Sequence, residues 1–189
     1  MLMASATRPG SRLGSDDWVA AAYDRFREEG LGGVRVEAIA RDLGTTKGSF
    51  YHHFGDRAEL VAAVMDRWER EETDHFMIEA DAAPGPRERL EVLFRGIGQR
   101  RIPGEDSLYL DAEREGVSDC VREVTDRRVA YVAAALVELG IEPAEARRRA
   151  LATVGAVLGL EQLARGGVGP IMAGRDEMQR TLLAIMTSP

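Results

Sequence analysis

A short run of polar and aromatic side chains around position 50 has the chemistry to bind nucleic acid. Lysine supplies a positive charge for phosphates, and hydroxyl and imidazole groups hydrogen-bond to phosphate oxygens or base edges. Lys47 is the single lysine of the chain, against 24 arginines. The run consists of Thr46, Lys47, Gly48, Ser49, Tyr51, His52 and His53. These groups can act on DNA together only if a surface element presents them together.

Two short helices with a glycine turn between them would present the run. Apolar residues recur at helical spacing over residues 36–43, which predicts a short helix with one buried face. Gly44 can end that helix in a sharp turn, because glycine adopts a positive φ without a steric penalty. Thr46 offers a cap for a second helix over residues 47–54. This arrangement is typical of a helix-turn-helix, whose second helix reads the major groove.

The phase of the second helix decides which side chains face outward. Phe50 and Phe54 lie four residues apart, so both should point into the core. Gly48 would let the backbone approach the duplex closely. The side chains then expected on the outer face are Lys47, Ser49, Tyr51 and His52.

Other interpretations of these residues stay open. Tyr51 could be a packing residue whose hydroxyl reaches a phosphate, and His53 could be half-buried against the preceding helix. Lys47 could be an ordinary solvated lysine. A metal site is not expected, because neighbours on a helix such as His52 and His53 point about 100° apart.

Composition and charge fit a soluble globular protein with a small reading surface. Hydrophobic residues make up 44% of the 189 residues, and the net charge is −7. Residues 1–60 carry 8 basic and 9 acidic side chains, and residues 61–189 carry 17 and 23. Residues 35–57 carry 4 basic and 3 acidic groups. A neutral-to-basic head on an acidic body suits a sequence-specific binder with little non-specific affinity.

Several other classes of protein are disfavoured. No apolar stretch reaches the roughly 20 residues of a membrane span, and the N-terminus lacks the apolar core of a signal peptide. The single cysteine, Cys120, fits a reducing cytoplasm and reads as a small core residue. Catalytic motifs of hydrolases, zinc proteases and nucleotide-binding enzymes are missing. We therefore expect a cytoplasmic protein that is not an enzyme and needs no cofactor, metal or membrane.

Periodicity predicts helices along the rest of the chain and favours no strand. Residues 1–14 lack periodicity and are expected to form a flexible arm. The clearest linker is residues 81–86, with two prolines and a glycine. An N-cap at Ser15 opens the first predicted helix, and Gly30 stops it. Besides the two short helices over residues 36–43 and 47–54, helices are expected at residues 16–29, 57–80, 87–101, 106–115, 117–139, 142–165 and 175–186. The fold class is therefore all-α with about nine helices.

The stretch VRVEAIARDLGTTKGSFYHHFGDRAELVAAV resembles the tetracycline-repressor (TetR) family of transcription regulators. The order of Gly44, the Thr46–Ser49 run, the Phe50–Phe54 run and the Asp56-Arg57 pair is similar to that family's order. With its lead-in helix, the resemblance covers roughly 45 residues. The remainder is similar only in length and helix rhythm. The resemblance implies an N-terminal three-helix domain over residues 15–56 and a ligand-binding and dimerisation domain over residues 57–189.

The resemblance also implies roles for individual residues. Thr46 would cap the reading helix and touch a phosphate, and Arg57 would hold the DNA backbone from the start of the fourth helix. Arg35 stands where the family usually has a serine or threonine cap, so it can pair with a phosphate but cannot cap. Contacts to bases or phosphates are implied for Lys47, Gly48, Ser49, Tyr51, His52 and His53.

The C-terminal part could hold an effector, although its aromatic residues could equally fill an ordinary core. The candidate pocket residues are Trp68, His75, Phe76, Phe94, Tyr109, Tyr131 and Gln162. The last two helices suit an interface, because Gly155 and Gly159 would let helices approach closely beside neighbouring apolar residues. The final helix should place Met178, Leu182, Ile185 and Met186 on one face. A four-helix bundle across a two-fold axis would result, unless these helices fold back on their own core.

The sequence thus predicts a homodimeric bacterial DNA-binding regulator. In the leading interpretation it is a repressor, bound to a palindromic double-stranded operator on the nucleoid and released by a small-molecule effector. The alternative is an activator or architectural DNA-binding protein without a ligand switch. Both use the same reading helix.

Overall fold

The chain folds as an assembly of helices, and the described residues contain no strand. The computed structural model describes residues 13–99, 103–165 and 175–188. Counting the long rod of residues 57–81 as one helix, these residues form nine helices and one short 3-10 turn, Leu31–Gly33. The prediction of an all-α chain with about nine helices is confirmed. The predicted arm lies almost wholly in residues 1–12, which are outside the described residues.

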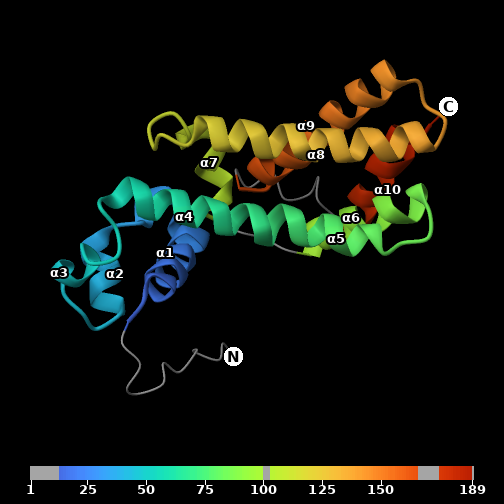
Figure 1. Ribbon diagram of the computed structural model, residues 1–189. Helices are drawn as coiled ribbons and strands as arrows, with labels where there is room; N and C mark the ends of the chain where they lie inside the picture. The colour runs from blue at the N-terminus through green and yellow to red at the C-terminus, as the bar shows by residue number, and fades with distance from the viewer. Residues whose placement is uncertain (1–12, 100–102, 166–174, 189) are drawn as a thin grey trace.

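Three short helices form a head at one end of the molecule (Figure 1). They are α1 (Ser15–Glu29), α2 (Val36–Asp42) and α3 (Lys47–Phe50). The N-cap of α1 is Gly14, one residue before the predicted Ser15, because the Asp17 carboxylate accepts a hydrogen bond from the Gly14 amide at 2.8 Å. The predicted third helix is also too long. After Phe50 the chain continues in turns, since the amide of His53 bonds to the Phe50 carbonyl three residues back.

A long rod leads from the head into the body and runs alongside α8 (Figure 1). It consists of α4 (Arg57–Glu69), a π-helical turn (Arg70–Asp74) and α5 (His75–Asp81). The predicted helix over residues 57–80 is therefore confirmed in extent. The π turn inside it was not foreseen.

The remaining helices complete the body within a few residues of their predicted bounds. They are α6 (Pro86–Gln99), α7 (Glu105–Asp111), α8 (Ser118–Glu138), α9 (Pro143–Arg165) and α10 (Arg175–Met186). Helix α7 ends at Asp111, four residues earlier than predicted. The chain then continues in turns up to Gly116, which has φ +72°. Of the described helices, none is long and apolar enough to cross a bilayer.

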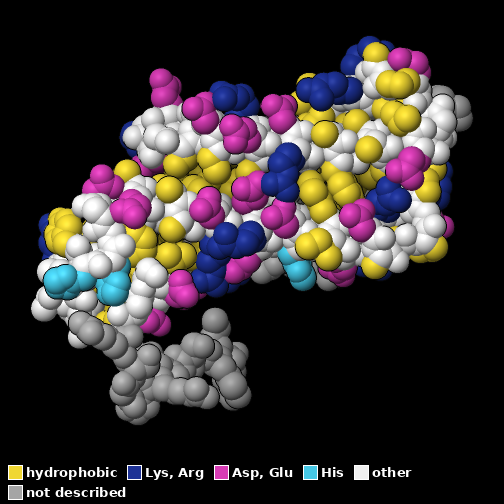
Figure 2. Space-filling view, viewed as in Figure 1, with side chains coloured by type: hydrophobic (Ala, Val, Ile, Leu, Met, Phe, Trp, Pro, Cys, Tyr) yellow, Lys and Arg dark blue, Asp and Glu magenta, His cyan; other side chains and the backbone are white. Residues whose placement is uncertain are grey.

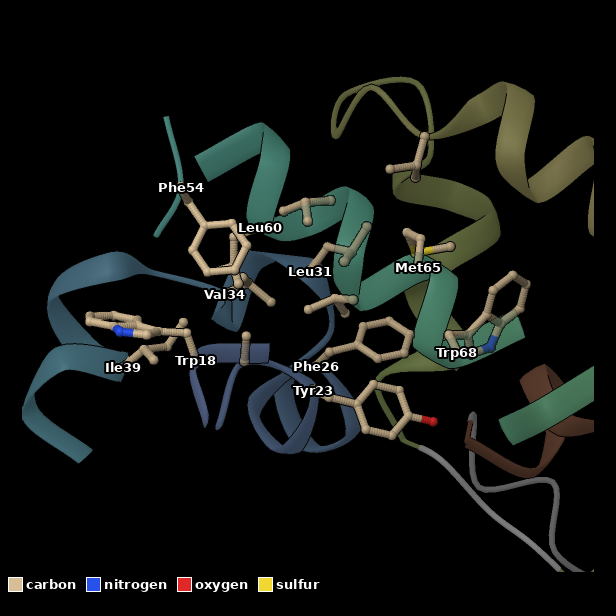
Figure 3. Packing of buried hydrophobic residues seen from close by; sticks show 14 of the residues in the cluster. Trp18, Tyr23, Phe26, Leu31, Val34, Ile39, Phe54, Leu60, Met65 and Trp68 are labelled. Atoms are coloured by element: carbon tan, nitrogen blue, oxygen red, sulfur yellow. The ribbon is translucent and has the colours of Figure 1, made fainter. Parts of the chain in front are cut away.

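Two apolar clusters hold the helices together. The first joins the head to α4, α7 and the first half of α8, and in Figure 3 its side chains interleave from Phe54 and Leu60 at one end to Trp68 at the other. The second lies between α5, α6, α9, α10 and the second half of α8, around Phe76, Phe94 and Leu136. The head therefore has no separate core of its own, because its apolar residues continue into the body.

Gly104, just before α7, brings the backbone of the body close to that of the head. Its amide donates to the Arg27 carbonyl at 2.9 Å, and the residue is buried against the C-terminal end of α1. A Cβ atom at this position would lie 1.5 Å from the Phe26 carbonyl oxygen. Only glycine fits here without movement of one backbone against the other.

We predict that Gly104→Ala destabilises the protein by about 1–3 kcal/mol or more, as overpacking of a rigid site does. Gly32→Ala is the matched control, because a Cβ atom at Gly32 meets nothing within 4 Å. Urea unfolding followed by circular dichroism measures both variants. Equal stability of the two variants would contradict the tight docking of α7 on α1.

Candidate nucleic-acid interface

The outward face of α3 depends on three aromatic rings beneath it. Phe50 and Phe54 are both buried, as predicted, and their rings stack with centroids 5.5 Å apart. The Trp18 ring of α1 meets Phe50 edge-on at 5.3 Å. Such contacts add stability beyond the apolar area they bury. They hold α3 at one rotation and leave its polar side chains toward solvent.

The turn before α3 is closed by backbone hydrogen bonds. The Thr45 amide bonds to the Ala40 carbonyl at 2.8 Å and the Gly44 amide to the Arg41 carbonyl at 3.1 Å, with Gly44 at φ +64°. This pair of bonds is a Schellman motif, which ends a helix and redirects the chain. Thr46 then caps α3 as predicted, since its hydroxyl oxygen accepts from the Ser49 amide at 3.3 Å. The sequence signals of the turn are thus confirmed.

The expected contact residues lie together at the exposed end of the head. Lys47, Gly48 and His52 are exposed, and 57% of the Tyr51 surface is accessible. Ser49 and His53 are half-buried. In Figure 2 the two histidines stand out over α3 at this end. The arrangement presents hydroxyl, imidazole and ammonium groups on one small surface, which suits hydrogen bonding to DNA phosphates and base edges.

Lys47 is paired with an acidic neighbour that sequence reasoning did not consider. Its ammonium lies 2.6 Å from the carboxylate of Glu37 on α2, and both side chains are exposed. The hydrogen bond raises the pKa of Lys47 and lowers the pKa of Glu37, so both groups are charged at neutral pH. A phosphate approaching Lys47 must compete with this carboxylate.

Arg57 is placed differently from the phosphate contact expected from the sequence. Its Nε donates to the Val34 carbonyl at 2.7 Å, and its Nη2 donates to the Leu31 carbonyl at 2.6 Å. The same Nη2 pairs with the Glu115 carboxylate at 2.8 Å, in the turn after α7. The guanidinium is therefore bonded to protein acceptors while its side chain stays partly exposed, and it ties the head to the body. Glu115 lies 58 residues away in sequence, so no local pattern pointed to it.

Arg35 keeps an exposed side chain at the start of α2. It makes no capping bond, as expected for an arginine, and its guanidinium lies 3.7 Å from the Glu29 carboxylate. Arg25 of α1 holds the other end of α2 with two hydrogen bonds to the Asp42 carboxylate, at 2.6 and 3.1 Å. Arg35 thus remains available to a phosphate, whereas Arg25 fixes the scaffold.

The candidate pocket residues do not gather around one point. Trp68 is buried in the first cluster and Tyr109 packs against it, whereas Phe76, Phe94 and Tyr131 belong to the second cluster. His75 and Gln162 are exposed. The Tyr131 hydroxyl lies 2.7 Å from the Asp81 carboxylate, a contact between α8 and α5. The candidates thus divide into one pair at the first cluster, Trp68 and Tyr109, and three aromatic residues at the second.

Residues 19–64 match the family model described as bacterial regulatory proteins, tetR family. The head therefore carries the tetR-family segment. The matched segment spans the head and the start of α4, including the whole candidate contact surface. Members of this family are transcription regulators, and that assignment supports DNA binding and agrees with the prediction that the chain is not an enzyme. No curated protein matches.

The TetR-family fold extends beyond the matched segment. A putative TetR-family regulator from Rhodococcus sp. superposes with a TM-score of 0.67 at 22% identity, over 91% of this chain and 95% of that one. FadR from Bacillus subtilis, in complex with stearoyl-CoA, gives 0.65 at 13% identity over 92% and 97%. BioQ with its double-stranded DNA operator gives 0.53 at 22% identity over 94% and 100%. At these identities the likeness shows a shared fold.

We predict that Glu37→Gln strengthens DNA binding roughly two- to fivefold, the size of an exposed charge effect. The change frees Lys47 and removes a negative charge beside the phosphates. Glu123→Gln is the control, because Glu123 is exposed on α8 and the change removes the same charge away from the head. Binding is measured by fluorescence anisotropy on a labelled duplex. Equal gains in both variants would mean that only net charge matters.

Proposed function

We propose that the protein is a repressor that binds a pseudo-palindromic DNA operator as a homodimer and is released by a small-molecule effector. The observation that carries the DNA-binding part is the orientation of α3. Phe50 and Phe54 are buried beneath it, so the polar side chains around them face solvent at the end of the head. The fold shared with BioQ, solved with its double-stranded DNA operator, supports the same use here.

The contact residues divide by chemistry. Lys47 and Arg35 supply charge for phosphates, while Tyr51 and His52 are exposed enough to reach base edges. Thr46 uses its hydroxyl oxygen as a cap acceptor and keeps its hydroxyl hydrogen for a phosphate. Contacts from Gly48, Ser49 and His53 belong to the same proposal, as secondary contacts at the edge of the surface.

The effector is proposed to bind beside the second cluster. Phe76, Phe94 and Tyr131 come from α5, α6 and α8, and the Phe76 ring packs on α6 at Gly96, where a Cβ atom would lie 2.5 Å from it. An apolar ligand entering between these helices would separate them and favour a second arrangement of the body. The likeness to FadR, solved with stearoyl-CoA, supports a ligand within this fold.

The dimer is proposed to form through α9. Leu151 is 60% exposed and Leu163 is 46% exposed, and the exposed Gly155 and Gly159 between them carry nothing within 4 Å of an added Cβ. A row of small and apolar residues on a helix surface fits a close helix-helix contact across a two-fold axis. In α10 the predicted face divides, since Ile185 is exposed but Met186 is buried in the chain's own core, and the Met178 side chain lies outside the described residues.

The proposal assigns DNA binding to residues 15–56 and effector binding and dimerisation to residues 57–189. Because the operator is chromosomal DNA, the protein would work in the cytoplasm, bound to the nucleoid. A two-fold dimer would place two α3 helices in successive major grooves, about 34–36 Å apart.

We predict that Lys47→Ala and Tyr51→Ala each weaken operator binding by about 1–3 kcal/mol if they contact bases, with folding unchanged. The operator is the duplex that the wild-type protein selects from a random-sequence library. Arg122→Ala serves as the control, because Arg122 is an exposed arginine of α8, away from the head, that pairs with nearby Asp119 at 2.8 Å. Wild-type affinity in both head variants would refute the assignment of α3.

We predict that Gly155→Leu yields folded monomers. Within one chain the new side chain has space, so the substitution acts only on a partner helix packed against α9. Ala134→Leu, at an exposed position of α8, is the control for added surface hydrophobicity. Sedimentation velocity gives the oligomeric state and circular dichroism the fold. Intact Gly155→Leu dimers would move the proposed interface away from this face of α9.

A further inference from the structure

A layer of polar side chains separates the two apolar clusters. The first cluster ends at Trp68 on the rod and at Val124 on α8, and the second begins at Phe76 and Val129. Only these two long helices contribute core residues to both clusters among the described residues. Between the clusters α8 remains a regular α-helix, whereas the rod passes through its π turn, Arg70–Asp74. The π turn thus lies at the joint between the head side and the body side.

Two consecutive arginines of α8, Arg127 and Arg128, hydrogen-bond to residues in and beside this π turn. Arg127 does so from the solvent side. Arg127 donates to the carboxylates of both Glu69 and Asp74. These carboxylates are five residues apart, and at about 100° per residue an α-helix would point them some 140° away from each other. The π turn closes with an i→i+5 bond, from the His75 amide to the Arg70 carbonyl, and brings such residues onto one face. The double contact of Arg127 therefore fits the π form and not the α form.

Arg128 holds the same turn from inside. Its Nη2 donates to the Glu72 carbonyl at 3.1 Å and its Nε to the Thr73 hydroxyl at 2.9 Å, so a backbone acceptor of the turn is satisfied by α8. Its Nη1 reaches Glu105 of α7 at 3.3 Å, and its guanidinium lies over the Trp68 ring at 4.9 Å. One cation thus joins the π turn, α7 and α8 at the joint.

We propose that Arg127 and Arg128 are positioning residues that keep the rod in its π form and thereby set the rotation of the head relative to the body. A π turn holds one more residue than the α-helical turn it replaces. When it relaxes to α-helix, that residue rotates one end of the rod by about 100° and shifts it by about 1.5 Å relative to the other end. The clusters on either side cannot both keep their contacts through this change. The joint therefore has two discrete arrangements, and release from DNA corresponds to the loss of the π form.

This inference rests on the proposed DNA-binding function, and a deletion separates the two. Arg128→Leu removes the inner grip, so the rod should relax and lose its register. Deleting Arg70, an exposed residue of the turn, removes the surplus residue and lets a regular α-helix keep both clusters in place. A merely structural role for Arg128 predicts no rescue by this deletion. Arg122→Leu is the matched control on the exposed face of α8.

The first readout is affinity for the duplex that the wild-type protein selects from a random-sequence library. We expect Arg128→Leu to lose affinity by about 5- to 150-fold, the range of ordinary conformational coupling. The Arg70 deletion combined with Arg128→Leu should regain most of it, and the Arg122→Leu control should bind as wild type. If the combined variant binds no better than Arg128→Leu alone, the proposal is overturned. Should Arg128→Leu fail to fold by circular dichroism, Arg127→Ala replaces it, because Arg127 is half exposed.

The second readout needs no DNA and remains valid if no duplex is selected, an outcome that would count against the proposed function only. Spin labels at exposed Arg41 on α2 and exposed Ala134 on α8 report the distance between the two sides, in a Cys120→Ser background. The distance should change in Arg128→Leu and return to the wild-type value with the Arg70 deletion. An unchanged distance in Arg128→Leu, or a changed one with the Arg70 deletion alone, overturns the register mechanism.

Discussion

The apolar cluster that runs from Trp18 to Val124 is the constraint on which the rest of the molecule depends. A three-helix head of some 40 residues buries too little apolar surface to be stable alone. The head meets this limit by sharing its core with α4, α7 and α8, and the Arg57 bonds and the buried Gly104 lie along the same boundary. If the body changes its arrangement as proposed, the packed side chains of this cluster would pass the change to the head without a separate signalling element.

The head and the helices that share its core, α4, α7 and the first half of α8, form one packed unit. The layer of polar side chains between the two apolar clusters marks where this unit ends. An uninterrupted apolar core would fuse head and body into one block, whereas buried ion pairs and hydrogen bonds demand particular partners and geometry. Glu72, almost wholly buried, accepts a hydrogen bond from the Tyr23 hydroxyl at 3.3 Å, and burial with this carboxylate raises the pKa of Tyr23. The network thus specifies one arrangement of α1, the rod and α8, and a change in the rod has to break several bonds at once.

Features set by local sequence were predictable, and features set by distant partners were not. The inward phase of Phe50 and Phe54 and the cap at Thr46 follow from spacing and residue type within a few positions. The orientation of the Arg57 side chain depends on its ion pair with Glu115, which is distant in the sequence. The π turn is held by Arg127 and Arg128, which are also distant in the sequence. Periodicity did not reveal the π turn, because the extra residue shifts the apolar phase by about 100° but only two buried residues of the rod, Phe76 and Ala80, follow the turn, too few to make that shift visible in the sequence.

The pairing of Arg57 with Glu115 lowers the number of free cations near the reading surface. The Arg57 guanidinium is already bonded to Glu115 and to the Val34 carbonyl. Among the described residues of α2 and α3 and just before them, the exposed cations are Arg35, Arg41 and Lys47. Of these, Lys47 is already neutralised by Glu37. Non-specific affinity grows with the number of phosphates neutralised, so a reading surface with so few free cations among its described residues would bind random DNA weakly. Correct base contacts must then supply the free energy that breaks the Lys47–Glu37 pair. On the proposed function, the acidic partner would thereby increase discrimination between operator and other DNA, at some cost in affinity.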